Sequence, residues 1–260
     1  MVLTFTQTVL AIASGSIVGF SLGLVGGGGS ILAVPLLVYV VGLDNPHIAI
    51  GTSAIAVALN AASNLAIHAR AGNVKWNCSA VFAAAGVAGA LLGSTLGKMM
   101  DGHKLLALFS LLMMVVGALM LRHGARAGDS SVNLSRQNLS KLLGLGLMAG
   151  MLSGFFGIGG GFLIVPALML ATGMPILNAV GSSLVSVTAF GLTTAGNYAW
   201  SGLVDWPLAG LFVSEGLLGG LLGARSAKSL ADRRGALTTA FAVLIFAVAI
   251  YMLVRSLNLI

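Results

Sequence analysis

The sequence predicts an all-α polytopic membrane protein made of two inverted-topology repeats, each containing five hydrophobic segments. Hydrophobic residues make up 58% of the chain and charged residues only 7%, whereas a soluble domain carries roughly 25% charged residues. Apolar runs recur with lengths typical of membrane crossings, and a glycine-rich motif occurs twice. A water-soluble fold cannot bury this much apolar surface, so we expect the chain to lie in a lipid bilayer.

Polar residues divide the chain into ten apolar segments. They cover residues 4–24, 30–42, 47–69, 77–97, 104–121, 140–156, 161–172, 177–199, 207–224 and 235–254. The second and seventh are short, since a helix of about 12 residues spans about 18 Å and the hydrocarbon core is about 30 Å thick. Each follows a glycine cluster. We therefore expect the first two segments of each repeat to be broken or re-entrant around a Gly-rich turn.

The two halves of the chain match each other. Residues 23–35, with their glycine cluster and Pro35, align with residues 154–166, which end in Pro166. Further matches are Gly51-Thr52-Ser53 with Gly181-Ser182-Ser183, Trp76 with Trp206, and Gly86, Gly89 and Gly93 with Gly216, Gly219 and Gly223. Small residues at such spacing let membrane helices approach closely, which predicts a packing role for the last set. The expected organisation is a first transmembrane repeat over 1–122, a cytoplasmic linker over 123–139 and a second repeat over 140–260.

Five segments per half bring the second half into the membrane from the opposite side. With the loops placed on that basis, most of the thirteen basic residues lie on one side of the membrane, and the positive-inside rule makes that side cytoplasmic. This predicts periplasmic termini and a place in the bacterial inner membrane. Inverted repeats around broken helices are a frequent plan for secondary transporters, which bind their substrate where the halves meet.

The two glycine clusters are candidate anion sites. Glycine permits a sharp turn and the close approach of a ligand, and a helix that begins there points its free N–H groups and positive dipole end at the cluster. Such a helix start binds an anion without a buried Lys or Arg. The candidate residues are Gly26, Gly27, Gly28, Gly29, Ser30, Gly159, Gly160 and Gly161. Alternatively, the glycines only let two short helices turn tightly.

Polar side chains form a stripe on the third segment and another on the eighth. The candidate substrate ligands are Thr52, Ser53, Asn60 and Asn64 on the third segment, and Ser182, Ser183 and Asn197, with Ser186 and Thr193 or Thr194 beside them, on the eighth. Hydroxyl and amide groups within a bilayer are costly unless they pair with another helix or face a wet cavity. Hydrogen bonding between helices is the alternative role, and for a single Ser or Thr it is the more common one.

Few titratable residues lie within the segments. Glu215 is the only acidic residue deep inside one, where a carboxylate is paired, hydrated or protonated, so it is a candidate for proton coupling or for a structural hydrogen bond. His68 and Arg70 end the third segment and are candidates for a gate, with anchoring at the interface as the alternative. Interfacial anchoring is also the role predicted for four aromatic residues, Trp76, Trp200, Trp206 and Tyr198.

The doubled glycine motif and the two Gly-(Ser/Thr)-Ser starts resemble the TauE/SafE family of sulfite exporters. The matching stretches are Gly26 to Pro35, Gly157 to Pro166, Gly51-Thr52-Ser53 and Gly181-Ser182-Ser183, and the resemblance covers nearly the whole chain. It implies a permease that exports sulfite or a small organosulfonate such as sulfoacetate, driven by the proton motive force.

The predicted function is therefore a secondary transporter of a small anion and not an enzyme, with no cofactor, metal or nucleic acid and with a monomer or homodimer as the assembly. Cys78 is the only cysteine, and the clusters lack the lysine of a phosphate loop. An intramembrane serine hydrolase is one alternative. His68 is about 22 Å of helix from Ser53, too far for a base that must reach its nucleophile, but a pairing with Ser183 stays open. A passive anion channel is the other alternative.

Overall fold

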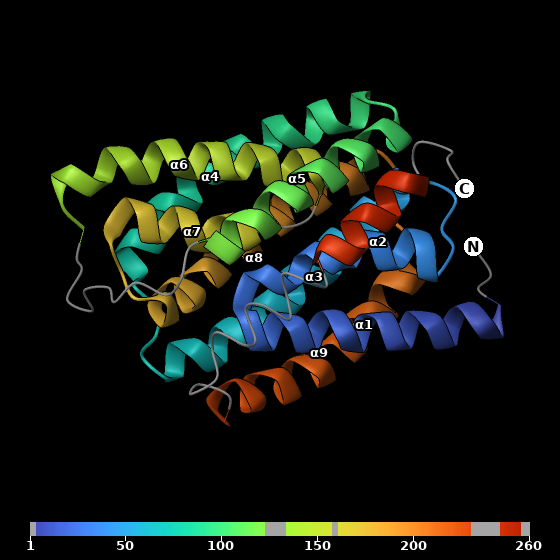
Figure 1. Ribbon diagram of the computed structural model, residues 1–260, viewed down its shortest axis with the longest axis horizontal. Coiled ribbons are helices and arrows are strands. Elements are labelled where there is room, and N and C mark those ends of the chain that lie inside the picture. The colour runs from blue at the N-terminus through green and yellow to red at the C-terminus, as the bar shows by residue number, and fades with distance from the viewer. Residues whose placement is uncertain (1–3, 123–133, 158–160, 230–244, 256–260) are drawn as a thin grey trace.

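The computed structural model describes residues 4–122, 134–157, 161–229 and 245–255, and within these ranges all regular elements are helices. The long helices lie side by side, roughly along the longest axis of the molecule (Figure 1). Six of the described helices are long and apolar enough to cross a membrane: α1 (Phe5–Val25), α3 (Pro46–Arg70), α4 (Trp76–Met99), α6 (Arg136–Phe156), α8 (Ile176–Trp200) and α9 (Trp206–Ser229). The predicted all-α fold with several crossings is confirmed.

Three further described helices are not among these six. They are α5 (Gly102–Arg122), α7 (Gly161–Thr172) and a C-terminal helix, Ile245–Arg255. The predicted second segment is broken into a 3-10 helix η1 (Gly26–Leu32), one turn of α-helix α2 (Ala33–Pro35) and a π-helical turn η2 (Leu36–Val40). Each predicted segment therefore coincides with a helix or with this broken stretch, although residues 235–244 of the tenth lie outside the described residues.

Glycine and proline explain why the second segment is broken. Gly29 lies so close to α1 that a Cβ at this position would be 2.3 Å from the backbone nitrogen of Leu22, so only glycine fits. Pro35 cannot donate a backbone hydrogen bond, which interrupts a regular α-helix. The chain therefore folds back tightly beside α1.

Two helix pairs join the first half of the chain to the second through glycine rows. α1 packs along α9, and α4 packs along α6. A Cβ at Gly219 would lie 2.2 Å from the carbonyl oxygen of Ser16, and a Cβ at Gly89 would lie 2.2 Å from that of Leu147. The backbones touch in the same way in both pairs, so the predicted packing role of these glycines is confirmed.

The helices α3 and α8 cross at the centre of the bundle in an antiparallel orientation. Gly51 near the start of α3 faces Tyr198 near the end of α8, while Gly191 of α8 faces Ala54 and Ala58. The helix α3 also contacts α9, and α8 contacts α4. The four helices that carry the predicted polar stripes and the glycine rows therefore pack in the order α9, α3, α8 and α4.

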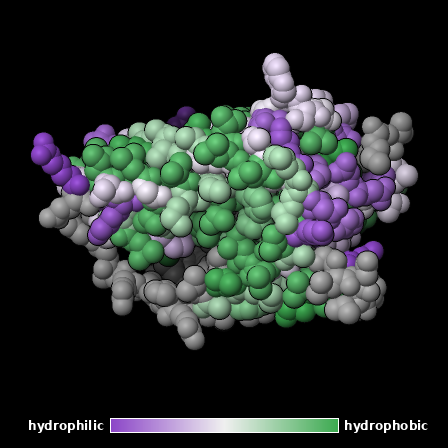
Figure 2. Space-filling model, turned by 90° about the horizontal axis from the view of Figure 1, so that it is seen from above, coloured by the Kyte–Doolittle hydropathy of each residue, from purple (hydrophilic) through white to green (hydrophobic). Residues whose placement is uncertain are grey.

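The surface fits a bilayer. The face in Figure 2 is apolar across its middle, and hydrophilic side chains gather toward its two ends. Trp76, Trp200 and Trp206, at helix ends, are exposed, as expected of interfacial anchors. The same prediction for Tyr198 is wrong, because this side chain is completely buried where the end of α8 meets the start of α3.

The first turn of α1 and the last turn of the C-terminal helix lie at the same end of the bundle (Figure 1). Most of the predicted linker, residues 123–133, lies outside the described residues. The described part ends in a capping box, in which the Ser135 hydroxyl accepts a hydrogen bond from the N–H of Asn138 at the start of α6.

Candidate functional site

Asn60 carries an amide group to which the described part of the fold gives no hydrogen bond. It lies near the middle of α3 and is completely buried. Neither its amide nitrogen nor its amide oxygen has a hydrogen-bond partner among the described residues. An unpaired buried polar group costs about 1–3 kcal/mol, and most such groups in proteins are paired. The chain therefore keeps an unused donor and acceptor in the centre of the bundle.

Asn64 adds a second amide one turn further along α3. It is 2% exposed, and its amide nitrogen donates to the carbonyl oxygen of Asn60 at 3.0 Å. Its amide oxygen has no partner in the described part of the chain. The two asparagines thus form a continuous polar surface on one face of α3.

Two glycines of α9 make room for these amides. A Cβ at Gly216 would lie 1.9 Å from the amide nitrogen of Asn60, and a Cβ at Gly220 would lie 2.9 Å from that of Asn64. We call these four residues the amide seat. From the sequence only a packing role is predicted for Gly216, and nothing distinguishes Gly220 from the other glycines. Spacing shows that glycines form a row, but not that part of the row faces α3 instead of α1.

The helix α8 also carries buried polar groups. Ser186 and Thr194 are completely buried, and neither hydroxyl has a hydrogen-bond partner among the described residues. Since α8 packs against α3, these two hydroxyl groups lie on a direct neighbour of the helix that carries Asn60 and Asn64.

The short helices of the two halves touch each other. The 3-10 helix η1 contacts α1, α3, α7 and α8, and Ser30 and Gly161 are both buried. Gly26 to Gly29 belong to η1, and Gly161 begins α7. Gly159 and Gly160 lie outside the described residues. The structure therefore places the described parts of the two Gly-rich segments in contact with each other.

Thr52 and Ser182 each form a hydrogen bond between their own helix and the residue that precedes a helix of the other half. The Thr52 hydroxyl accepts a hydrogen bond from the N–H of Asp205 at 3.0 Å, and the Ser182 hydroxyl accepts one from the N–H of Lys75 at 2.9 Å. Asp205 directly precedes α9, and Lys75 directly precedes α4. We call these two bonds the helix-start clamps.

The glycines before these hydroxyls are part of the clamps. A Cβ at Gly51 would lie 2.1 Å from the carbonyl oxygen of Leu203, and a Cβ at Gly181 would lie 2.6 Å from that of Asn73. Each glycine lets a loop of the other half lie directly on the helix. In the structure the Gly-(Ser/Thr) pair therefore connects the halves.

Ser53 and Ser183 use their hydroxyl groups within their own helices. Ser53 donates to the carbonyl oxygen of Ile50 at 3.0 Å, and Ser183 donates to that of Val180 at 2.8 Å. Both side chains are completely buried. Their hydroxyl protons are thus occupied in this conformation.

The Asn197 amide is held by α4. It donates to the Ser94 hydroxyl at 2.7 Å, and Lys98 donates to its side-chain oxygen at 2.7 Å. Lys98 also donates to the Ser201 hydroxyl at 2.8 Å. Sequence reasoning missed Lys98, because a basic residue at the end of a segment was assigned to topology.

None of the three residues predicted for gating or proton coupling belongs to the amide seat, although Glu215 directly precedes Gly216 on α9. Glu215 is half-buried, and its Cβ would be 3.2 Å from a Cβ placed at Gly15 of α1. His68 is half-buried near the end of α3, about 12 Å along the helix from Asn60, and Arg70 is exposed. Within the described chain no group of three His, Cys, Asp or Glu side chains could hold a metal ion.

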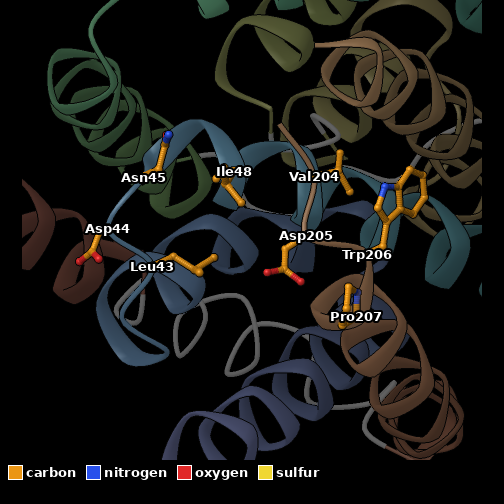
Figure 3. A pocket seen from close by; sticks show the side chains of 8 residues that line it. All are labelled: Leu43, Asp44, Asn45, Ile48, Val204, Asp205, Trp206 and Pro207. Carbon is orange, nitrogen blue, oxygen red and sulfur yellow. The ribbon is translucent and has the colours of Figure 1, made fainter. Parts of the chain in front are cut away.

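A hollow of about 440 Å³ opens where α3 and α9 begin. Asp205 and Leu43 point toward its middle, and Asp44 lies at its edge (Figure 3). Thr52, whose hydroxyl binds the Asp205 N–H, is about 12 Å along α3 from Asn60. The hollow therefore leads to the clamp and not directly to the amides.

Comparison with known proteins gives one family. Residues 11–252 match the model of the family described as "Sulfite exporter TauE/SafE". A "Probable membrane transporter protein" of Xylella fastidiosa (strain Temecula1 / ATCC 700964) is 51% identical over 255 residues, 98% of each chain. The "Probable membrane transporter protein YunE" of Bacillus subtilis (strain 168) is 27% identical over 239 residues, 83% of this chain and 87% of the relative. No solved structure matches the chain.

Proposed function

Because the chain belongs to the TauE/SafE sulfite exporter family of membrane transporters, we propose that it is a secondary transporter that exports a small sulfur-containing anion. Sulfite or an organosulfonate such as sulfoacetate is the proposed substrate, and the bacterial inner membrane is the proposed location. The observation that carries the proposal is the buried Asn60 amide, which has no partner among the described residues. A substrate oxyanion would accept the hydrogen bonds that the fold leaves unused.

The proposed substrate site lies between the halves. Asn60 and Asn64 supply donors from α3, and α7 contributes a helix start that carries partial positive charge. The contact of η1 with both α3 and α7 supports this arrangement. Thr52, Ser53, Ser182, Ser183 and Asn197 support the site through the hydrogen bonds that they make inside the protein.

We further propose that the halves are inverted repeats with periplasmic termini. Two features support it. The equivalent helices α3 and α8 run antiparallel, as inversion requires, and α1 pairs with α9 as α6 pairs with α4. In this arrangement the site lies where one repeat rocks against the other, which is the usual plan for alternating access.

The proton motive force is the proposed energy source. Glu215 lies on α9 one residue before the glycine that seats Asn60, so a proton exchanged there would act on the same helix. His68 and Arg70 are proposed to belong to the cytoplasmic gate because they end the helix that carries the amides.

The geometry favours a carrier over the two alternatives. A passive channel needs a continuous wet path, whereas Asn60 is completely buried. A serine hydrolase needs a free nucleophile next to a base, whereas the Ser53 and Ser183 hydroxyls donate to backbone carbonyls. The curated relatives that match are named membrane transporters.

Counterflow in proteoliposomes tests the proposal. Vesicles that contain the purified protein and are loaded with unlabelled sulfite or sulfoacetate should accumulate labelled sulfite. Asn60→Ala should slow this exchange on the order of ten- to a hundredfold, since a hydrogen bond to a charged group contributes about 1.5–3 kcal/mol. Equal counterflow in vesicles without protein would refute the transport of sulfur anions by this chain.

The double variant Asn60→Ala, Gly216→Ala separates a ligand role from a packing role. Removal of the amide leaves space for the new methyl group at Gly216, so the fold should tolerate the pair. If Asn60 binds the substrate, transport stays lost in the double variant. Recovery of transport would show that Asn60 only fills the space over Gly216.

A further inference from the structure

The hydrogen-bond donors of the proposed substrate site are neutral in the part of the chain that the structure describes. In the described part of the chain, α1, η1 and α7 contain no charged residue, and α8 contains none either. Three charged residues of α3 and α9 have described side chains. Glu215 lies beside Gly15 of α1, and Arg70 and Arg225 lie near the ends of their helices. No described Lys or Arg therefore faces the amide seat from these six elements.

Neutral donors discriminate between anions by charge. The cost of taking an ion from water into a low-dielectric interior grows with the square of its charge, so a dianion costs about four times as much as a monoanion of the same size. An opposite charge in the site would offset this cost. Amide N–H groups and helix starts carry only partial charges, and these offset the cost for a monoanion much more completely than for a dianion.

We propose that the site, if the chain transports sulfur anions as proposed above, selects monoanions over dianions. The transported form of sulfite is then hydrogensulfite, HSO3⁻, and not SO3²⁻. Monosulfonates such as methanesulfonate fit the same requirement. Sulfoacetate carries a second charge on its carboxylate and is therefore a poorer substrate than methanesulfonate, and sulfate competes much less than methanesulfonate does.

Several titratable groups lie on the helices around the proposed site, so the pH dependence of the protein must be separated from that of the substrate. On α3 they are His47 and His68, on α9 Glu215, on α8 Tyr198 and on η2 Tyr39. The helix α5, which also contacts α3, contributes His103 and Lys104 near its start. Protonation of any of these would alter the exchange of every substrate, whereas the charge of the substrate alters only the exchange of sulfite.

The test is exchange at equal pH on both sides of the membrane, so that no proton gradient drives it. Sulfite loses its second proton near neutrality, and methanesulfonate is a monoanion throughout this range. At a fixed, low total concentration, sulfite exchange should fall about tenfold for each pH unit above the second pKa of sulfite, as its monoanion fraction does. Methanesulfonate exchange should change less than about twofold over the same range. The variant Ser63→Ala, which alters an exposed hydroxyl on the same helix, should behave like the unaltered protein.

The outcomes separate the two proposals. If neither sulfite nor methanesulfonate exchanges at any pH, the proposed function is wrong. If both exchange and the sulfite rate follows total sulfite or rises with pH, or if sulfate competes as well as methanesulfonate, charge selection is wrong and the proposed function stands. A parallel fall of both rates would assign the pH dependence to a protein group and would also overturn charge selection.

Discussion

Gly216 of α9 and Gly86 of α4, which we call the two glycine seats, share a backbone arrangement. Gly216 of α9 lies against Gly19 of α1, and Gly86 of α4 lies against Gly150 of α6. A Cβ at Gly19 would be 2.0 Å from the carbonyl oxygen of Gly216, and a Cβ at Gly150 would be 2.0 Å from that of Gly86. Each of these two glycines is therefore contacted on one side by a helix from the other half of the chain.

The side chains that occupy the two seats differ. Asn60 of α3 lies over Gly216, whereas Phe190 of α8 lies over Gly86, where a Cβ would be 1.9 Å from the tip of its ring. The Phe190 ring is completely buried and stacks on Phe82 with 6.3 Å between the ring centroids. One seat is thus filled by an apolar ring with partners and the other by an amide without them.

The difference shows which occupant the fold requires. A phenyl ring fills the space over a glycine at no polar cost, so packing alone would accept an apolar residue at position 60. An amide there adds an unpaired polar group to the core, which destabilises the folded state. Natural proteins keep such local conflicts mainly at functional sites. The comparison therefore supports the proposal that Asn60 over Gly216 binds the substrate, whereas Phe190 over Gly86 fills its space by apolar packing.

Phe190→Asn is expected to give the largest effect. It removes the ring from Phe82 and leaves a second buried amide, so we expect the free energy of unfolding to fall by about 3–5 kcal/mol. Thermal unfolding of the purified protein in detergent measures this. Phe190→Leu keeps an apolar occupant and is the matched control. If both variants are equally stable, the Gly86 seat does not depend on apolar packing and the contrast between the seats fails.

Asn60→Leu is the reciprocal change and should separate stability from function. Leucine has the same number of side-chain heavy atoms as asparagine, and it removes the unpaired amide, so we expect stability to rise by about 1–3 kcal/mol. Sulfite counterflow should be lost. Ser63→Ala, on the exposed side of α3, should change neither quantity. A destabilised Asn60→Leu variant would mean that the amide is paired in the folded protein.

The course of the helices could be predicted from the sequence because it depends on local features. Apolar runs between polar residues set the helix limits, and Pro35 after four glycines predicted the break in the second segment. The glycine row on α4 and α9 predicted close helix contacts, since only small residues allow them. These signals need no knowledge of which helix lies opposite.

The site could be predicted only in part, because periodicity shows a face and not its neighbour. Asn60 and Asn64 were predicted to lie on one polar stripe of a helix, and both side chains are buried on α3, while their role as substrate ligands stays a prediction. Their seat was missed, since Gly216 could equally face α1 or α3. Tyr198 was placed at the interface by its position near a helix end, although α8 carries it inward against Gly51.

The helix-start clamps are expected to give the smallest effects, and they test how alike the two halves are. Thr52→Val and Ser182→Ala each remove the acceptor of one backbone N–H, at Asp205 and Lys75 respectively, which should cost about 1 kcal/mol in each case. The reciprocal changes Thr52→Ser and Ser182→Thr keep the hydroxyl and should restore stability. Since the clamps share no residue, the two losses should add in a double variant. Strongly unequal losses, or losses that do not add, would show that the two clamps stabilise the fold differently. The equivalence of the halves would then hold for the glycine seats alone.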